Sequence, residues 1–348
     1  MNFTMNSAYI NFISSFLPEK KISNNAIANL NPKWNSESIF NKIGINNRHV
    51  LDKNESTIDL ILSAVNLFFN NNNCVKPIDI DGIILCTQTS EISIPTNACL
   101  IQSVFKMRKD ILTFDYNLGC SGYVYGLSIA KGLVLSEDVS KILVITAEAY
   151  SKRIHKNDYK NRSIFGDGAT VTLVSNKKYV NSLNFQIGRF SFGTDGSGFG
   201  DLFFSNNKSK KILKKYSVNF QNPEFENSLH MDGGNIFNFT MKEVPVLVNK
   251  NITKNDLSAI EDIKYFIFHQ ANAFMLNAIR RRCKIPQDKF IIEMKESANT
   301  VSSTIPIAFQ NSFYLSNDKN ILDGQKIMLV GFGVGLSMAA CTITYENS

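Results

Sequence analysis

Short runs of apolar residues alternate along the chain with longer segments in which apolar residues recur every three or four positions. The short runs are continuously apolar, which is typical of strands buried on both faces. The longer segments have the period of amphipathic helices. This alternation predicts an α/β fold in which helices cover a sheet. Strands are expected at residues 81–87, 111–117, 142–146, 170–174, 265–269 and 327–330, and helices at residues 56–69, 97–105, 123–135, 274–283 and 304–315.

Two sequence patterns occur twice in the same order. Residues 165–174 (FGDGATVTLV) are echoed by residues 332–341 (FGVGLSMAAC), and residues 82–89 (GIILCTQT) by residues 265–272 (YFIFHQAN). Repetition of this kind indicates a duplicated unit, although glycine-rich hairpins also recur by chance. We therefore predict two halves that meet near residue 175, an N-terminal half of residues 1–175 and a C-terminal half of residues 176–348.

The composition is that of an ordinary globular protein. The chain has 348 residues, of which 44% are hydrophobic and 19% charged, and this excludes disordered, collagen-like and coiled-coil chains. Its net charge of +7 is mild for this length. The charge is therefore no argument for nucleic acid and agrees equally with an acidic partner or a phosphate-bearing ligand.

The cysteines and the apolar segments bear on metal sites and cell compartment. Six cysteines without a CxxC pair, and only four histidines, favour neither a zinc site nor a disulfide framework. We expect most of the cysteines to be buried and the protein to be cytoplasmic. The stretch 8–17 is interrupted by polar residues, and the run 327–341 is shorter than the ~20 residues that span a bilayer, so neither a signal peptide nor a membrane span is predicted.

Cys120 is a candidate reactive residue because of the turn in which it lies. The turn, Gly-Cys-Ser-Gly at 119–122, follows the expected strand 111–117 and precedes a helix. A helix N-terminus stabilises a thiolate through its free amides and its dipole. Cys120 is therefore either a nucleophile or a buried cysteine in a tight turn, and this segment alone does not decide between them.

Two further residues are candidates because of their positions. His269 ends an expected strand, which is where α/β proteins place working groups, although a lone histidine is more often a core or surface residue. Asn299 lies in a small polar loop before a helix expected to begin near residue 305. Its side chain is expected either to cap that helix or to donate a hydrogen bond to a developing oxyanion.

The glycine-rich segments give only weak nucleotide signals. Residues 331–335 (GFGVG) lack the Gly-Lys-Ser/Thr ending of a phosphate loop. No strong strand is apparent before residues 193–200 (GTDGSGFG), and no helix is apparent after them. The lysine-rich run 208–215 (KSKKILKK) is interpreted as a solvated surface loop, with an anionic partner as the alternative.

Taken together, the motifs resemble the thiolase superfamily, specifically the β-ketoacyl-acyl-carrier-protein synthase III family. The resemblance extends over nearly the whole chain, and its motifs occur in the family's order. They lie at residues 8–19 (AYINFISSFLPE), 42–49 (KIGINNRH), 87–102, 119–122 (GCSG), 165–169 (FGDGA), 231–233 (MDG), 269–272 (HQAN), 298–300 (ANT) and 332–337. The resemblance implies a duplicated five-layer αβαβα sandwich.

The resemblance also implies roles for individual residues. Cys120 would be the nucleophile, with His269 and Asn299 as the other catalytic groups and the amides of Cys120 and Val334 as the oxyanion hole. The implied reaction is acylation of Cys120 and then decarboxylative condensation with a malonyl thioester, without metal or redox cofactor. Coenzyme A or phosphopantetheine thioesters would be the substrates. The implied substrate contacts are Phe332, Gly333, Gly233, Asn272 and, across a homodimer interface, Ile94.

The sequence departs from the family pattern in places that bear on the acyl donor. Ser38 occupies the position of a tryptophan that stacks on the adenine of coenzyme A, and the only tryptophan, Trp34, comes four residues earlier. Phe274 replaces an arginine that contacts the carrier. The neighbouring Arg280, Arg281 and Arg282 would restore positive charge for an acidic carrier protein. We therefore expect a donor carried on a protein rather than on coenzyme A.

Ile94 and the intact Cys-His-Asn set bear on specificity and reaction type. Ile94 lies where a phenylalanine can limit chain length, so a longer or branched acyl group is expected. Retention of Asn299 favours carbon–carbon bond formation over a non-decarboxylating acyltransferase, which remains the main alternative. A papain-like peptidase and a non-catalytic relative are less favoured. The sequence leaves open whether the pathway is fatty-acid initiation or a specialised one.

Overall fold

The structure is a computed structural model that describes residues 7–31, 33–136, 138–180, 182–204, 206–218, 225–316 and 320–347. Its strands are β1 (Tyr9–Phe16), β2 (Lys21–Ser23), β3 (Asn47–His49), β4 (Gly82–Cys86), β5 (Leu112–Tyr116), β6 (Lys141–Glu148), β7 (Gly168–Ser175), β8 (Asn184–Thr194), β9 (Leu202–Phe204), β10 (Leu229–Met231), β11 (Tyr265–Phe268), β12 (Phe290–Ile291), β13 (Lys326–Gly333) and β14 (Ser337–Glu346). Its α-helices are α1 (Asn24–Ala28), α2 (Ser36–Ile43), α3 (Thr57–Asn71), α4 (Asn97–Val104), α5 (Gly122–Leu135), α6 (Tyr159–Ile164), α7 (Asn207–Lys215), α8 (Gly233–Lys254), α9 (Ala273–Arg282) and α10 (Thr304–Gln310).

The main sheet is built from two copies of one strand arrangement. Its order is β12-β11-β13-β14-β8-β1-β7-β6-β4-β5, so the order β5-β4-β6-β7-β1 is mirrored by β12-β11-β13-β14-β8. In each half the first three strands pair with one another in parallel. The fourth strand pairs antiparallel with the third, and the fifth antiparallel with the fourth. The halves join where Tyr9 and Ile10 of β1 pair with Gln186 and Phe185 of β8. This symmetry confirms the duplicated fold, and the predicted boundary near residue 175 falls at the end of β7.

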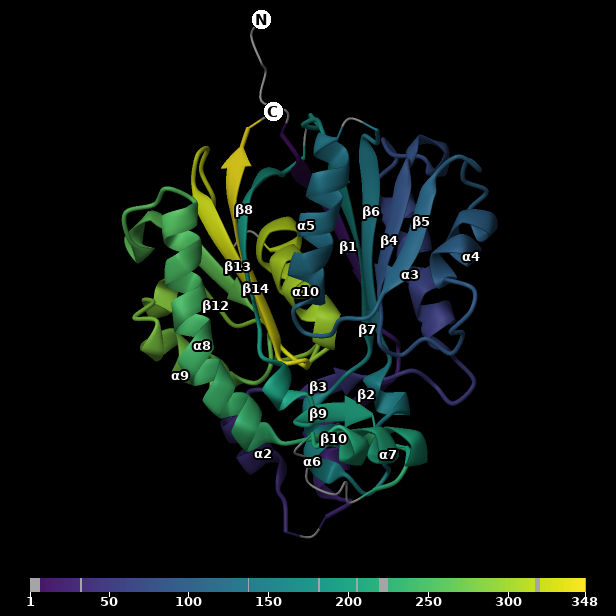
Figure 1. Ribbon diagram of the computed structural model, residues 1–348, viewed down its shortest axis with the longest axis vertical. Coiled ribbons are helices and arrows are strands. Elements are labelled where there is room, and N and C mark those ends of the chain that lie inside the picture. Colours follow the sequence, from purple (N-terminus) through teal and green to yellow (C-terminus); the bar gives the residue numbers. More distant parts are fainter. Residues whose placement is uncertain are drawn as a thin grey trace, which may run out of the picture.

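Helices cover both faces of each half and give five layers. Helices α5 and α10 lie between the two half-sheets (Figure 1), in a core that takes residues from both halves. A second core packs α3 and α4 against the outer face of the N-terminal strands. A third packs α8 and α9 against the C-terminal strands. The αβαβα arrangement expected from the resemblance is confirmed.

The expected strands and helices are present, with ends that differ by at most three residues except for the helix expected at 304–315. Helix α3 begins where the sequence provides a capping box, in which Ser56 and Asp59 exchange side chain–backbone hydrogen bonds. The helix expected at 304–315 is α10 followed by a π-helical turn, Asn311–Leu315. Two long elements, β8 and α8, were not predicted. The interpretation of residues 193–200 is corrected by β8, because this strand leads directly into them.

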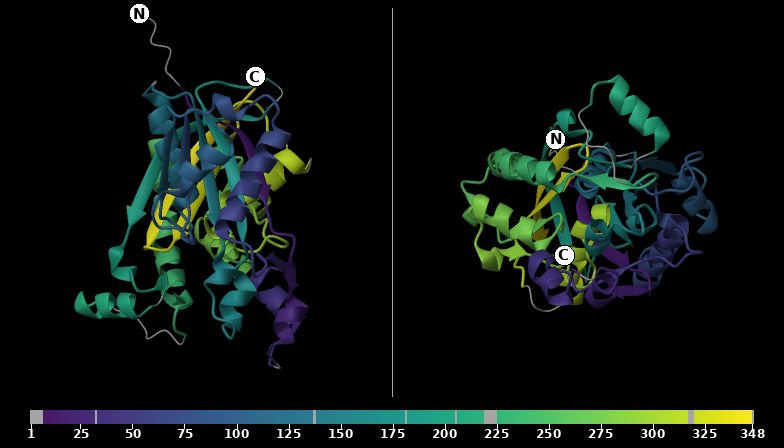
Figure 2. Two further views of the ribbon diagram at one scale, coloured as in Figure 1. Left: turned by 90° about the vertical axis from the view of Figure 1, so that its right-hand side faces the viewer. Right: turned by 90° about the horizontal axis from the view of Figure 1, so that it is seen from below.

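Short elements form a separate region at one end of the sheet. Helices α2, α6 and α7, with β9 and β10, gather at the end opposite the chain termini (Figures 1 and 2). The lysine-rich run is mostly helix α7, not a loop. Within the described ranges, no helix combines the length and apolarity needed to cross a bilayer.

Candidate active site

Cys120 lies in the tight turn between β5 and α5, two residues before the helix begins, as the sequence predicted. Two glycines of β13 allow this turn to pack against the neighbouring strand. A Cβ atom on Gly331 would lie 2.6 Å from the Cα atom of Ser121, and one on Gly333 would lie 2.7 Å from the Cys120 Sγ atom. Real Cβ contacts are longer than this. The two halves of the fold therefore meet at the sulfur only because these positions lack side chains.

The surroundings of the Cys120 sulfur act on its pKa in opposite directions. Cys120 is 6% exposed, and burial raises the pKa of its thiol to about 12. Hydrogen bonds from the backbone N–H groups of Val334 and of Cys120 itself lower this pKa. Negative charge on Glu148 raises it further. These effects on the pKa indicate that both amides lie close to the sulfur, beside which the oxyanion of an attacked thioester would form.

His269 directly follows the last residue of β11, and hydrogen bonds fix both its backbone and its ring. Its backbone N–H donates to the carbonyl of Val330 (2.8 Å), and its Nδ1 atom is 2.8 Å from the Thr304 hydroxyl oxygen. That hydroxyl donates in turn to the carbonyl of Val301 (3.0 Å). Because Nδ1 is engaged, Nε2 is the ring nitrogen that is available to a substrate. Burial lowers the pKa of His269 to about 3, so the imidazole is neutral at physiological pH.

The backbone around Asn299 is fixed from both sides. Its N–H donates to the carbonyl of Ile164 (3.1 Å), and its carbonyl accepts from the N–H of Gly166 (3.0 Å). Ala298 and Val301 have φ angles of 60° and 56°, a conformation that L-residues rarely adopt. The Asn299 Oδ1 atom accepts from the N–H of Val301 (2.9 Å). Asn299 therefore does not cap α10. Its Nδ2 atom donates one hydrogen to the carbonyl of Ala271 (3.4 Å), which leaves the other for a substrate in the cavity that Asn299 lines.

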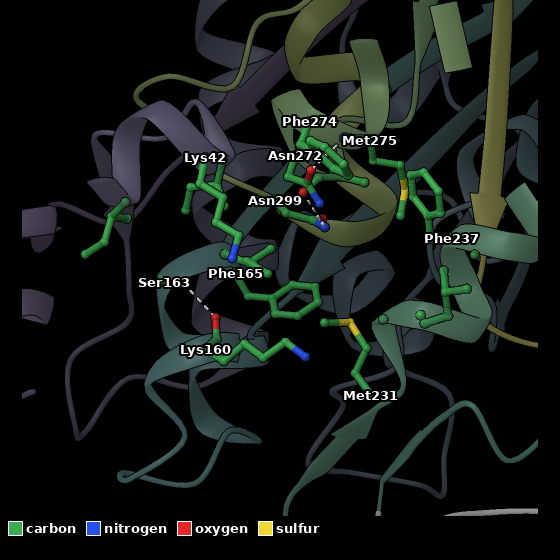
Figure 3. Close-up of a pocket in the computed structure, with 18 of the residues that line it drawn as sticks. Lys42, Lys160, Ser163, Phe165, Met231, Phe237, Asn272, Phe274, Met275 and Asn299 are labelled. Atoms are coloured by element: carbon green, nitrogen blue, oxygen red, sulfur yellow. Dashed lines mark hydrogen bonds between the residues drawn. The ribbon is translucent and has the colours of Figure 1, made fainter. Parts of the chain in front are cut away.

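One cavity of about 740 Å³ brings the three candidates together, although they are far apart in the sequence. Its walls come from α2, α6, β9, β10 and the first turns of α8 and α9 (Figure 3). The lining is mainly apolar and aromatic, as is usual for small-molecule sites. Cys120, His269 and Asn299 line it together with Ile39, Phe165, Leu202, Met231, Ile236, Phe237, Phe274, Met275 and Phe332.

The predicted substrate contacts differ in where the structure places them. Phe332, Gly333, Gly233 and Asn272 line the cavity, and Asn272 also caps α9 by accepting from the N–H of Met275 (2.8 Å). Ile94 is 88% exposed and is not part of the lining within this chain.

The three arginines of α9 also differ from one another. Arg280 is partly buried and donates to the carbonyl of Ile285 (3.1 Å), whereas Arg281 and Arg282 are exposed.

The cavity also contains lysines that the sequence did not single out, together with residues already noted as departures from the family pattern. Lys42 of α2 and Lys160 of α6 extend into it, with Phe165 between them in Figure 3. Neither lysine forms an ion pair with a described residue. Trp34 lines the same cavity, as does Ser38. Phe274 stacks on Phe237 with ring centroids 5.8 Å apart. Only the tertiary fold brings Lys42 and Lys160 to one cavity, and neither was selected from its local sequence.

The cysteines and metal-binding residue types were also located. All six cysteines are free; Cys86, Cys120 and Cys341 are buried, Cys283 is partly buried, and Cys74 and Cys99 are exposed. The expectation that most are buried was therefore too broad. Within the part of the chain that the structure describes, no group of three His, Cys, Asp or Glu side chains could hold a metal ion.

Comparisons with known proteins cover nearly the whole chain. A family model described as "3-Oxoacyl-[acyl-carrier-protein (ACP)] synthase III" matches residues 114–196, and one described as its C terminal region matches residues 252–345. The β-ketoacyl-[acyl-carrier-protein] synthase III of Lactococcus lactis subsp. cremoris is 33% identical over 97% of this chain and 99% of its own length. The protein of that name from Clostridium novyi is 31% identical over 95% and 97%. A crystal structure of a 3-oxoacyl-(acyl-carrier-protein) synthase III superposes with a TM-score of 0.87, at 36% identity and 97% and 99% coverage.

Proposed function

The chain belongs to the 3-oxoacyl-[acyl-carrier-protein] synthase III family of condensing acyltransferases, and on this basis we propose that Cys120, His269 and Asn299 are its catalytic residues. The reaction is transfer of an acyl group to a cysteine, followed by decarboxylative condensation with a malonyl thioester to give a 3-oxoacyl thioester. The observation that carries the residue assignment is their convergence on one cavity from three separate segments. Two amides are directed at the sulfur among them.

The first step would acylate Cys120. Its sulfur attacks the thioester carbonyl, and the tetrahedral oxyanion is held by the N–H groups of Cys120 and Val334. The carbon–sulfur bond to the carrier then breaks, and the carrier leaves as a thiol. The proton lost by Cys120 passes to that thiol. The neutral His269 can relay this proton through Nε2, because its Nδ1–H is held by Thr304.

The second step would form the carbon–carbon bond. A malonyl thioester loses carbon dioxide, and the resulting enolate oxygen accepts hydrogen bonds from the Asn299 amide and the His269 ring. For this role the ring must carry its hydrogen on Nε2: the Nδ1 proton is released to solvent and one is taken up on Nε2, while the Thr304 hydroxyl turns its own hydrogen from Val301 to Nδ1. The enolate carbon then attacks the acyl carbonyl, the bond from that carbon to the Cys120 sulfur breaks, and the thiolate takes up a proton from solvent. Atoms and electrons balance in both steps without a metal or a redox cofactor.

We infer the substrates and partners from the cavity. Lys33, Lys42 and Lys160 provide positive charge in a mainly apolar cavity, which suits the phosphate of a coenzyme A or phosphopantetheine thioester. Exposed Arg281 and Arg282 suit an acidic carrier protein, whereas Arg280 is already engaged by Ile285. A carrier-bound donor remains our proposal. The activity belongs to fatty acid biosynthesis, and we propose a cytoplasmic homodimer in which the exposed Ile94 enters the partner's acyl site.

An experiment that follows both half-reactions tests the assignment. Intact-mass measurement after incubation with acyl donors should show an acyl adduct on the wild-type protein and none on Cys120→Ala. Radiolabelled malonyl-carrier should then release carbon dioxide. Asn299→Leu has a side chain of similar size without the amide, so it should keep acylation and lose most of the decarboxylation. An adduct on Cys120→Ala, or undiminished decarboxylation by Asn299→Leu, would refute the residue roles.

The same experiment distinguishes the alternative function and the donor. Acylation without any carbon dioxide release, together with an ester or amide product, would indicate a non-decarboxylating acyltransferase instead. Donors on coenzyme A and on a carrier protein are compared at equal concentration. Faster acylation from the carrier would support a protein-bound donor, and a strong preference for coenzyme A would refute it.

A further inference from the structure

Glu148 is a buried acid that the proposed reaction leaves without a role. It is the last residue of β6 and is completely inaccessible to solvent. It forms no ion pair with any described residue. The positive charge of Arg153 acts on it, but Arg153 donates to the carbonyls of Thr89 and Ser90. Burial of a carboxyl group without a paired cation is costly, so an ion pair does not explain why Glu148 lies here.

One side of the Glu148 carboxyl is connected to the turn that carries Cys120. The backbone N–H of Gln88 donates to both carboxyl oxygens, at 3.1 and 3.3 Å. The Gln88 side chain accepts from the Tyr150 hydroxyl (2.7 Å) and donates to Asn117 (3.0 Å). Its Oε1 atom would be 2.5 Å from a Cβ atom on Gly119. Gln88 thus packs directly against the residue before Cys120.

The other side of the carboxyl is connected to the loop that carries Asn299. The hydroxyl of Ser302 donates to Glu148 Oε1 at 3.0 Å. Ser302 lies between Asn299 and Thr304, the residue whose hydroxyl contacts His269. Through Gln88 and Ser302, Glu148 therefore connects the turn that carries Cys120 with the loop that carries Asn299 and the Thr304 hydroxyl, although these segments are about 180 residues apart in the chain.

We propose that Glu148, as an uncharged carboxylic acid, is a positioning residue that fixes the Cys120 turn and the Asn299–Thr304 loop relative to each other. This inference rests on the proposed function for the identity of the groups it positions. An uncharged acid can still accept from Ser302 and Gln88. The Thr89 hydroxyl, 3.5 Å from Oε2, is a third group that donates to it. Ionisation would place a negative charge where it acts on the Cys120 thiol.

The electrostatic surroundings agree with an uncharged acid below about pH 8. Burial raises the pKa of Glu148 to about 8, against the lowering effects of its hydrogen bonds and of Arg153. The other titratable groups that interact with it are the thiols of Cys86 and Cys120 and the phenols of Tyr116 and Tyr150. Negative charge on Glu148 raises the pKa of the Cys120 thiol. Ionisation above about pH 8 should therefore make Cys120 less reactive.

The variant Glu148→Gln tests this, because glutamine has nearly the shape of the protonated acid and is uncharged at every pH. We expect its rate of Cys120 acylation to be within about threefold of wild type at pH 7. The wild-type rate of Cys120 alkylation by iodoacetamide should fall behind that of Glu148→Gln as pH rises, by about threefold or more at pH 9.5. Glu148→Ala should lose about tenfold or more in acylation at pH 7, because the bridge is broken.

A matched control is Asp167→Asn, which alters a second buried carboxyl group. Asp167 accepts from the N–H groups of Leu51 and Ser151, and burial raises its pKa to about 6. This variant should keep the wild-type dependence of Cys120 alkylation on pH. The proposal is overturned if Glu148→Gln follows the wild-type alkylation profile to pH 9.5, or if it is as poor as Glu148→Ala at pH 7 while remaining folded by circular dichroism. Alkylation needs no malonyl substrate, so a failure of the proposed condensation would be seen separately.

Discussion

Substitution of Gly333 by alanine should disable the site without adding a polar or charged group. Gly333 is the last residue of β13, and Val334, whose N–H is directed at the Cys120 sulfur, follows it. An alanine Cβ atom would lie 2.7 Å from Sγ and 2.8 Å from the Cβ atom of Cys120. The φ angle of Gly333 is 156°, which residues with a Cβ atom rarely adopt. Either the sulfur or the Val334 amide must therefore move.

The size of the effect follows from these two strains. Overpacking of a dense site costs about 1–3 kcal/mol, and an unfavourable backbone conformation costs a similar amount. If the strain is relieved by moving the Val334 amide, one donor to the oxyanion is lost, which lowers the rate of acyl transfer by about 10²–10³-fold. We expect Gly333→Ala to lose about 100-fold or more in acylation of Cys120, and several degrees in melting temperature.

The assay compares Gly333→Ala with Gly132→Ala by intact-mass acylation kinetics and thermal unfolding. Gly132 lies on the exposed side of α5, and no atom lies within 4 Å of the position that its Cβ atom would take. Its replacement should leave acylation unchanged and stabilise the helix by about 0.5–1 kcal/mol. If Gly333→Ala acylates at the wild-type rate, the close approach of β13 to the sulfur does not position the site, and the reasoning fails.

Three further predictions concern His269, its hydroxyl partner and the exposed isoleucine. Thr304→Val keeps the shape but leaves His269 Nδ1 and the Val301 carbonyl without their hydroxyl partner. It should lower kcat about tenfold or more and stability by about 1–3 kcal/mol, and an unchanged kcat would contradict the proposed role of that hydroxyl. Because burial lowers the pKa of His269 to about 3, the unfolded chain binds its proton first as pH falls below about 6.5. Urea unfolding of wild type should therefore lose stability relative to His269→Gln between about pH 6.5 and 3, by an amount on the order of 5 kcal/mol, and parallel curves would refute this. Ile94→Phe should shorten the longest acyl chain accepted, measured with donors of increasing length, whereas Ile78→Phe on another exposed surface should not; an unchanged profile for Ile94→Phe would exclude its proposed place in the partner's acyl site.

The elements of the fold that were predicted have a recognisable local sequence pattern, and the elements that were missed lack one. Strands β4 and β6 are continuously apolar because layers cover both of their faces, and this property is visible in the sequence. Strand β8 is buried irregularly along its length, with exposed positions at Arg189 and Phe192, so no period distinguishes it. Helix α8 contains Pro245, which usually argues against a helix interior. In both cases tertiary packing outweighs the local pattern.

The candidate site shows the same division. Cys120 and His269 could be selected because each follows a strand, and Asn299 because it precedes a helix in a polar loop. The roles of these residues came from the resemblance of the whole set to a known family, since each segment alone had a structural alternative. Lys42 and Lys160 could not be selected, because α2 and α6 meet only around the cavity. Glu148 ends an apolar strand like many surface acids, and only the structure shows that it is buried.

Exclusion of water from the site has consequences for when charge can form there. Burial raises the pKa of Cys120 to about 12 and lowers that of His269 to about 3, so both groups are neutral before substrate binds. A resting thiolate–imidazolium pair would have to overcome both effects. The same low polarity strengthens the hydrogen bonds of the Cys120 and Val334 amides to a negative oxygen. Ionisation of the sulfur is thus favoured only when its charge can pass directly to a thioester carbonyl already held by those amides, which couples nucleophile activation to the presence of substrate.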